Sequence, residues 1–512
     1  MKPDTIIVLD FGGQYCHLIG RRVREQNVYS EIVPYNISIK EIENLNKKFN
    51  VKGLILSGGP SDIGKGQTLM IDKRILKSNL PILGLCYGHQ LIAYLMGGRV
   101  KMGKNGEYGI SFMNILENSK IFKGLNKKEK VWMSHRDSVY KLPKDFEVLA
   151  YTENCPVAAY EALNKSIYGL QFHPEVVHTE KGIKILKNFI FEICNCKSNW
   201  KIKDFIKESE NEIRKEIDSK AIIGLSGGVD SSVATAIASK VLGKNLIAVF
   251  VDHGFMREGE PEEINRTFRK FKMNFISVNA RDRFLKKLKG VIEPEEKRKI
   301  IGKEFIKVFE EIAKKYKAKY LIQGTIYPDR IESGFRKKSD RIKTHHNVGG
   351  LPNKVNFKKI VEPLRNLYKD EVRKIGDSIG LPKTIVYRQP FPGPGLAVRI
   401  IGEVTNDKLN ILKKADRIVK EEVEKANIKN LWQYFAVLTN TKSTGVKGDS
   451  RSYGYTIAVR IVESKEAMTA NFARIPYEVL EKISTRITNE IPEVTRVVYD
   501  ITHKPPSCIE WE

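Results

Sequence analysis

Long apolar runs are absent from this sequence. No stretch reaches the roughly 18 consecutive apolar residues that a membrane-spanning helix needs. The N-terminal segment MKPDTIIVLDFGGQ carries only the short apolar run Ile6–Leu9 before Asp10. This run is too short for the core of a signal peptide and is typical of a buried strand. We therefore expect a protein without a membrane segment that works in the cytoplasm.

Cysteine is also scarce, with six residues among 512. So few cysteines in a chain of this length do not make a disulfide framework. Cys194 and Cys196 lie close together, but neither a CxxC pair nor a histidine cluster joins them at the spacing of a zinc site. Internal repeats and low-complexity tracts are absent as well. What remains is a globular composition, with 41% hydrophobic and 29% charged residues.

Acidic residues are outnumbered, because 88 Lys and Arg stand against 61 Asp and Glu, for a formal net charge of +27. Such a charge suits nucleic acid or an anionic substrate. The lysines are scattered through amphipathic helical segments such as Glu311–Tyr320, however, and are not gathered in one block with aromatic residues. We therefore attribute the charge to solvated helix surfaces and expect no nucleic-acid partner.

The length suggests about three domains. Short apolar strands alternate with helices over residues 1–196 and again over residues 197–387, an order that favours α/β domains with mostly parallel sheets. The Pro- and Gly-rich stretch Arg388–Arg399 is predicted to form no regular element. Residues 388–512 then combine helices and strands as a small α+β domain. The expected strands are Ile6–Leu9, Gly53–Leu56, Ile82–Leu85, Val157–Tyr160, Ile167–Phe172, Ala221–Leu225, Asn245–Val251, Phe275–Val278, Tyr320–Ile322, Tyr434–Leu438, Tyr455–Val462 and Arg496–Asp500.

The segment PILGLCYGHQLIAYLMGG predicts a strand, a sharp turn and a helix, with Cys86 at the turn between Gly84 and Gly88. This is the pattern of a nucleophile elbow, with cysteine in place of serine. The helix N-terminus would favour the thiolate, and the backbone N–H of Tyr87 could face an oxyanion. A lone cysteine is more often an ordinary buried residue, so the interpretation depends on a base nearby.

The segment YGLQFHPEVVHT supplies such a base. His173 follows an apolar strand, and Glu175 comes two residues later. A nucleophilic cysteine needs a base to move protons, and the base needs a carboxylate to orient it. Cys86, His173 and Glu175 together provide these three roles.

These motifs resemble those of the class I glutamine amidotransferases, over about Thr5–Cys194. The resemblance implies a flavodoxin-like fold that hydrolyses glutamine to glutamate and ammonia, with Cys86, His173 and Glu175 as the catalytic residues. Arg136 stands where related synthetases often have a small residue, a departure that concerns the local loop and not the triad. The oxyanion hole and the glutamine contacts are implied to come from Gly58, Gly59, Tyr87, Gln90, Ser134, His135 and Asp137.

The stretch IIGLSGGVDSSVATAIA predicts a phosphate-binding loop between a strand and a helix, but it lacks the lysine of a Walker loop. Its two glycines let the backbone N–H groups point inward, the two serines after Asp230 add donors, and the helix N-terminus adds positive charge. A plain glycine-rich turn with a serine cap is the alternative. The complete string S-G-G-x-D-S-S is much rarer than such a turn.

The string resembles the pyrophosphate loop of the ATP pyrophosphatases, which cut ATP between its α- and β-phosphates. The resemblance implies an adenine-nucleotide alpha-hydrolase-like fold and a loop that keeps the leaving pyrophosphate, so that no Walker lysine is needed. Asp230 is implied to help hold Mg²⁺, which offsets the polyphosphate charge. The ATP-binding residues would be Ser226, Gly227, Gly228, Val229, Asp230, Ser231, Ser232 and Asp252.

A class I amidotransferase placed before an ATP pyrophosphatase resembles the GMP synthetase family. Glutamine-dependent NAD synthetases carry a nitrilase-type domain instead, and asparagine synthetases begin with a nucleophilic cysteine where this chain has Lys2. Segments of nearly the whole chain resemble the same family, namely EEKRKIIGKEF, LIQGTIYPDRIES, IKTHHNVGGLP, EPLRNLYKDEVRKIG, RQPFPGPGLAVRIIGE and YDITHKPPSCIEWE.

The family resemblance implies a lid and a tail that bind xanthosine monophosphate (XMP). The segment IKTHHNVGGLP is basic and glycine-rich, unlike a core, and could close over phosphates. Lys504 stands before two prolines that stiffen the tail, and is implied to meet the XMP phosphate, with Glu510 at the purine or ribose side. The full set of implied XMP and lid residues is Arg298, Asp329, Glu332, Lys343, His345, His346, Lys504 and Glu510.

The resemblance implies that ATP, XMP and glutamine are the substrates and that Mg²⁺ accompanies ATP. An adenyl-XMP intermediate would be aminated to GMP, with AMP, pyrophosphate and glutamate as the other products, in a homodimer joined through residues 388–512. Two alternatives remain. Enzymes that thiolate tRNA share the loop and could use the positive charge, but they need no glutaminase half. A nucleic-acid-binding or regulatory protein with an inactive amidotransferase would not need the intact triad.

Overall fold

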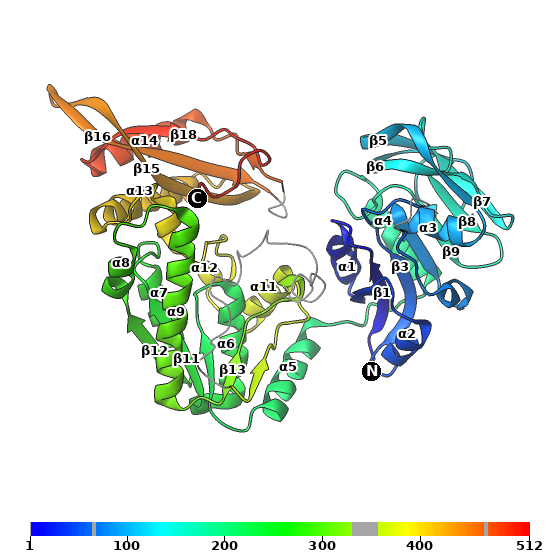
Figure 1. Cartoon of the computed structure of the whole chain (residues 1–512), viewed down its shortest axis with the longest axis horizontal. Helices are drawn as coiled ribbons and strands as arrows, with labels where there is room; N and C mark the ends of the chain where they lie inside the picture. Colours follow the sequence, from blue (N-terminus) through cyan, green and yellow to red (C-terminus); the bar gives the residue numbers. More distant parts are fainter. Residues whose placement is uncertain (1, 64–67, 330–356, 465–468) are drawn as a thin grey trace. The chain divides into compact units, whose positions relative to one another are not determined.

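Figure 1 shows the computed structural model of the chain, which describes residues 2–63, 68–329, 357–464 and 469–512. The chain divides into two compact units, Met1–Asp204 and Phe205–Glu512. Within the described ranges, no helix is both long enough and apolar enough to cross a membrane.

The first unit is built on one nine-stranded sheet. Its strands are β1 (Asp4–Asp10), β2 (Tyr29–Pro34), β3 (Asn50–Leu56), β4 (Ile82–Leu85), β5 (Arg99–Ile115), β6 (Lys128–Lys141), β7 (Phe146–Tyr151), β8 (Ala159–Ala162) and β9 (Ile167–Leu170). Five parallel strands follow the order β2-β1-β3-β4-β9, and the sheet continues with antiparallel β8, β7, β5 and β6. The parallel part has the strand order of a flavodoxin-like fold, as the sequence predicted.

Burial explains why the parallel strands could be read from the sequence. Ile6–Leu9 are fully buried, because a parallel sheet is covered on both faces and its strands become continuous apolar runs. The helices of this unit are α1 (Cys16–Arg24), α2 (Ile39–Leu45), α3 (Tyr87–Leu95) and α4 (Gly182–Lys187), the last continued by one π-helical turn over Asn188–Ile193.

The second unit begins with a five-stranded parallel sheet. Its strands are β10 (Ala221–Gly224), β11 (Leu246–Asp252), β12 (Asn274–Asn279), β13 (Tyr320–Ile322) and β14 (Lys359–Val361). The order is β12-β11-β10-β13-β14, so the direction of winding reverses between β10 and β13. Ligands of such sheets bind at the carboxyl ends of the strands beside that reversal. The helices are α5 (Ile202–Glu216), α6 (Val229–Leu242), α7 (Glu260–Phe268), α8 (Arg281–Leu288), α9 (Pro294–Tyr316), α11 (Lys369–Ser378) and α12 (Lys383–Val386).

The C-terminal part of the second unit is an α+β layer. It contains α13 (Asn406–Lys425), β15 (Leu431–Lys447), β16 (Ser450–Glu463), β17 (Asn471–Phe472), α14 (Tyr477–Glu490) and β18 (Val494–Tyr499). β15 and β16 form a long antiparallel hairpin whose tip projects beyond the helices, and β18 runs parallel to β16 (Figure 1). The stretch Arg388–Arg399 differs from expectation in part, because its last five residues, Gly395–Arg399, form a 3₁₀ helix.

One hydrophobic core extends from the parallel sheet into the C-terminal layer. It includes Ile222 and Val249 of β10 and β11, Leu412 of α13, and Ala436 and Ile457 of the hairpin. Residues on both sides of the expected boundary at 387/388 therefore bury their apolar surface together, within one compact unit.

Candidate functional site

The turn between β4 and α3 holds Cys86 in a strained backbone conformation. Its φ is +51° and its ψ is −104°, values that non-glycine residues rarely adopt outside functional turns. Strand and helix approach so closely that a Cβ on Gly84 would lie 2.6 Å from the Gly88 carbonyl, and one on Gly88 would lie 2.4 Å from the Leu56 oxygen. The glycines are therefore required by the turn that presents the sulfur at the start of a helix.

His173 and Glu175 lie in the loop that follows β9. The His173 Nδ1 atom is 2.7 Å from Oε1 of Glu175, and both side chains are buried. Burial by itself would lower the pKa of His173, but the charges of Glu175 and Cys86, with hydrogen bonds to both residues, raise this pKa well above its usual value. The arrangement can therefore hold a proton on the imidazole beside Cys86.

The loop after β3 borders both reacting groups. A Cβ on Gly58 would lie 3.3 Å from Cε1 of His173 and 3.6 Å from the Cys86 Cβ, and a Cβ on Gly59 would lie 2.9 Å from the Phe11 side chain. The side chain of Tyr87 is turned away, because its hydroxyl bonds to the backbone of Leu69. The Tyr87 side chain is therefore engaged elsewhere, and only its backbone N–H remains a candidate oxyanion donor, together with backbone N–H groups of the Gly58–Gly59 loop.

The structure brings the other predicted glutamine-site residues close to the elbow in different ways. The Cys86 thiol donates to the backbone oxygen of Ser134, with a distance of 3.7 Å. Gln90 donates from Nε2 to the Asp137 carbonyl at 2.7 Å. Gln171, which the sequence analysis did not single out, donates from its amide to the Cys86 sulfur at 3.7 Å.

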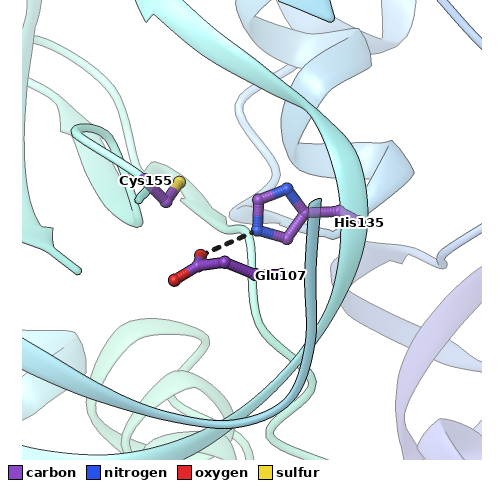
Figure 2. A group of neighbouring side chains, drawn as sticks. All are labelled: Glu107, His135 and Cys155. Atoms are coloured by element: carbon purple, nitrogen blue, oxygen red, sulfur yellow. Dashed lines mark hydrogen bonds and ion pairs between the residues drawn. The ribbon is translucent and has the colours of Figure 1, made fainter. Parts of the chain in front are cut away.

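Figure 2 shows His135 with Glu107 and Cys155, whose ligand-type atoms lie within 4.8 Å of one another. His135 Nε2 lies 3.2 Å from Glu107, and Nδ1 lies 3.0 Å from the Asp137 carbonyl. The Thr152 hydroxyl donates to Glu107 at 2.8 Å. Burial, with the Glu107 charge, raises the pKa of Cys155 to about 12, so its thiol is protonated at neutral pH. Hydrogen bonds thus account for this cluster, and we assign it a supporting role.

The segment Ser226–Ser232 follows β10: Ser226–Gly228 form a turn, and Val229–Ser232 are the first turn of α6, so the predicted loop is shorter than expected. Gly227 has a φ of +79°, and a Cβ there would lie 2.4 Å from Ile264. The hydroxyls of Ser226 and Ser231 are 3.0 Å apart, and that of Ser226 accepts from the Gly228 N–H. Across the winding reversal, a Cβ on Gly324 would lie 3.0 Å from the Ser231 nitrogen. The loop is thus folded around the N-terminus of a helix, at the sheet position where anions are bound.

Charged side chains surround this loop. Lys369, at the start of α11, places Nζ 3.0 Å from Oδ2 of Asp230. Oδ1 of Asp230 is buried without a hydrogen-bond partner among the described residues. Arg388 donates to the Gly227 carbonyl at 3.0 Å. The sequence analysis placed neither cation here, although both stand in segments that it quoted, because their distance from the loop along the chain hides the contact.

Asp252 and Val229 both lie at the carboxyl edge of the parallel sheet, but they contact different groups. Asp252 ends β11, and its carboxylate is 2.7 Å from Nη2 of Arg281 and accepts from the Gly254 N–H. Val229 is buried as the first residue of α6, so only its backbone could face a ligand.

The predicted XMP residues are held mainly by partners within the protein. Arg399 binds both carboxylate oxygens of Glu510, at 2.9 and 2.7 Å. Arg298 donates to a backbone oxygen of Glu512, and the Lys504 N–H donates to Ala470 at 2.7 Å. Asp329 accepts from the Ile326 N–H at 3.2 Å. The remaining candidates lie outside the described residues, and they are Glu332, Lys343, His345 and His346.

The raised pKa of His173 predicts a pH-dependent effect of Glu175→Gln. Protonated His173 stabilises the fold fully below its unfolded pKa of about 6.5, and this contribution is lost as the pH rises through the raised folded value. We therefore expect the urea-unfolding midpoint of the variant to fall below that of the unmodified protein by most near pH ~6, and by progressively less towards pH ~10.

The matched control is Glu180→Gln, which removes an exposed carboxylate 3.2 Å from Lys130. Its effect on the midpoint should be small throughout this range. A difference for Glu175→Gln that stays constant with pH would show that Glu175 does not hold a proton on His173.

Three family models match the chain. Glutamine amidotransferase class-I matches residues 7–193, NAD synthase matches residues 199–321, and GMP synthase C terminal domain matches residues 421–511. A glutamine amidotransferase of solved structure from Thermotoga maritima is 20% identical and covers 41% of this chain and 92% of its own, with a TM-score of 0.28.

Full-length relatives agree with the models. Proteins named GMP synthase (glutamine-hydrolyzing) are 55% identical to this chain in Caldicellulosiruptor saccharolyticus and in Halothermothrix orenii, and 52% identical in Clostridium tetani. Each alignment covers 100% of this chain and 100% of the relative. The comparisons confirm the resemblance that the motifs indicated, and the chain belongs to the family of glutamine-hydrolysing GMP synthases.

Proposed function

We propose that this chain converts XMP, ATP and glutamine into GMP, AMP, pyrophosphate and glutamate. One observation carries the proposal: a cysteine elbow beside a His–Glu pair and a serine-glycine anion loop occur in one chain that matches GMP synthases over its full length. The first site would release ammonia, and the second would activate XMP to receive it.

In the glutaminase step, the Cys86 thiolate attacks the side-chain carbonyl of glutamine. The N–H groups of Gly59 and Tyr87 would stabilise the negative charge that develops on the oxygen. Protonated His173 gives its proton to the departing nitrogen, so ammonia leaves and a thioester remains. Water, deprotonated by neutral His173, then attacks the thioester and releases glutamate, with Glu175 holding the ring throughout.

In the synthetase step, the C2 oxygen of XMP attacks the α-phosphorus of ATP, and pyrophosphate leaves. The N–H groups and hydroxyls of Ser226–Ser232 would hold the pyrophosphate, aided by the N-terminus of α6. Lys369 would supply positive charge at the loop, as a substitute for the lysine that the motif lacks. Ammonia then adds at C2, AMP leaves, and GMP is formed.

Residues of the loop fit a magnesium ion carried with ATP. Oδ1 of Asp230 is a buried carboxylate oxygen without a described partner, and carboxylate oxygens are ligands that Mg²⁺ accepts together with phosphate. When bound, the ion would neutralise polyphosphate charge. Asp230 would orient it, while Lys369 keeps the other carboxylate oxygen in place.

For XMP we propose that the C-terminal tail forms one wall of the site. Lys504 would contact the phosphate. Glu510 would act next to the nucleotide through Arg399, because that guanidinium already binds both of its oxygens. Arg298, Asp329, Glu332, Lys343, His345 and His346 remain our candidates for nucleotide and lid contacts.

We further propose that two copies pair through the C-terminal layer. A groove of about 350 Å³ lies between α14 and β18, lined by Leu480, Ile483 and Val497 among others. Among the residues that line it, Tyr477 is 85% exposed and Val498 is 41% exposed, whereas Ile483 is buried. Exposed apolar residues gathered around a groove are typical of a protein interface.

Cys86→Ala should separate the two half-reactions. Without the nucleophile, GMP formation from XMP, ATP and glutamine should fall by at least about a thousandfold. GMP formation with added ammonia should stay within about twofold, because Cys86 takes no part in the synthetase step. The decrease in XMP absorbance measures both. Glu180→Gln, which changes an exposed carboxylate of the first unit, should affect neither. Failure of the unmodified protein to form GMP with either nitrogen source would overturn the proposed function.

Lys369→Met should impair the synthetase step whichever nitrogen source is supplied. Loss of a cation beside the leaving pyrophosphate should lower pyrophosphate release by about a hundredfold, equally with glutamine and ammonia. Lys374→Met changes an exposed lysine of the same helix and is the matched control. A rise in the KM for glutamine alone would contradict the assignment of Lys369 to the phosphate loop.

Tyr477→Asp should weaken the proposed dimer. A charged side chain in an apolar interface should make the free energy of association less favourable by about 2 kcal/mol or more. In sedimentation equilibrium, we expect the unmodified protein to have twice the mass of one chain, which is 58.4 kDa. The variant should shift towards the mass of a single chain. Tyr94→Asp, at an exposed tyrosine of α3, should leave the mass unchanged. A monomeric unmodified protein would contradict the dimer.

A further inference from the structure

A line of buried polar side chains ends at the sulfur of Cys86. Gln171 follows β9, is fully buried, and directs Nε2 to Sγ at a distance of 3.7 Å. Its own Oε1 accepts from Nε2 of Gln90, a buried residue of α3, at 3.1 Å. A buried amide must have partners for both of its ends, and these two contacts provide them.

The direction of both amides is set by a backbone group. The Asp137 carbonyl can only accept, so the Gln90 atom 2.7 Å from it must be the NH₂ group. The second hydrogen of that group then points to Gln171, so the Gln171 atom that accepts it must be the amide oxygen. The NH₂ group of Gln171 is consequently left facing the sulfur. Reversal of Gln90 would place its oxygen against the Asp137 carbonyl, and reversal of Gln171 would place two NH₂ groups against each other, in both cases in a buried position.

The Asp137 carbonyl, at which this line of polar side chains begins, is itself held in place. The Asp137 carbonyl also lies 3.0 Å from Nδ1 of His135, whose other nitrogen pairs with Glu107. Figure 2 shows this pair, and Glu107 of β5 and His135 of β6 lie directly opposite each other in the β5–β6 hairpin. Glu107 is held in turn by the hydroxyl of Thr152. Gln171, Gln90, His135 and Glu107 are therefore each positioned by a partner from another segment, while Asp137 is held by His135 of its own strand.

The contact matters because the sulfur has opposite neighbours. The Ser134 carbonyl accepts from the thiol, which favours the protonated sulfur, and this bond is lost when the thiolate forms. The Gln171 amide donates, and a donated hydrogen bond becomes stronger when its acceptor is charged. The titratable groups that interact with the sulfur are His173, with Glu175 behind it, and the neighbouring thiol of Cys155.

We propose that Gln171 is a positioning residue for the glutaminase step, which holds the Cys86 sulfur in its attacking orientation through an amide N–H, and that Gln90 fixes the direction of this amide. The inference rests on the proposed function, since it concerns the nucleophile of that function. It gives Gln90 a task within the protein, in addition to the substrate contact that the motif implied.

Gln171→Met tests the proposal, because it removes the donor and keeps a similar volume. The rate at which iodoacetamide alkylates Cys86, followed by mass spectrometry of its peptide across a pH series, reports the thiol pKa. We expect this pKa to rise by about one unit, the size of one hydrogen bond to a charged group. The kcat for glutamate release should fall about tenfold with little change in KM, and the ammonia-driven reaction should be unaffected.

Gln90→Met and the double variant add a second test. If Gln90 acts through Gln171, the double variant should shift the pKa no further than Gln171→Met does alone. Additive shifts would overturn the proposed order. Gln26→Met, which removes an amide bonded only to a helix carbonyl at 3.3 Å, is the matched control and should leave the pKa unchanged.

The outcomes separate this inference from the function on which it rests. An unchanged thiol pKa in Gln171→Met would overturn the inference, as would an increase in KM alone, which would make Gln171 a substrate-binding residue. Loss of near-ultraviolet circular dichroism in the variant would transfer the test to Gln90→Met, which should raise the same pKa by a smaller amount, and no rise there would equally overturn it. Failure of the unmodified protein to release glutamate would instead refute the glutaminase assignment.

Discussion

The close crossing of β4 and α3 is the contact on which the first site depends. Because both elements have glycine where they meet, the chain can turn within one residue, and Cys86 takes a backbone conformation that a relaxed loop would not keep. The turn places the sulfur beside the loop that carries His173 and beneath the Gly58 loop. Backbone packing therefore brings the Gly58 loop, the His173 ring and Cys86 close together.

The second unit solves a related problem with the same means. A strand again ends in glycines and a helix again begins at the carboxyl edge of a parallel sheet, so that backbone N–H groups converge. The difference lies in what they face. The first turn presents the buried sulfur of Cys86 close to His173, whereas the segment Ser226–Ser232 brings two serine hydroxyls together, and Lys369, from a distant part of the chain, contributes a cation.

Most of the parallel strands and the two glycine-rich turns could be predicted because each is written in a short continuous stretch, but the parallel strands β2 and β14 were not among those expected. The residues that mark the Cys86 turn and the Ser226–Ser232 segment are close together in the sequence, and Glu175 comes two positions after His173. Lys369, Arg388 and Gln171 could not be placed, because tertiary packing alone brings them to their sites. The β5–β6 hairpin also escaped prediction. Tyr108, Ile110 and Phe112 are exposed there, so the usual pattern of apolar residues inside does not mark the strands.

The continuous core of the second unit has a consequence for how such a chain can be divided between genes. A break in the coding sequence near residue 204 would give two products that each keep their own core. A break near residue 388 would divide one core. Ile222 and Val249 would be in one product, and the apolar residues Leu412 and Ile457 of the same core would be in the other. Gene fission could therefore give a separate ammonia-producing subunit. The parallel sheet of the second unit and the C-terminal layer, which share one core, would have to stay in one polypeptide or fold together.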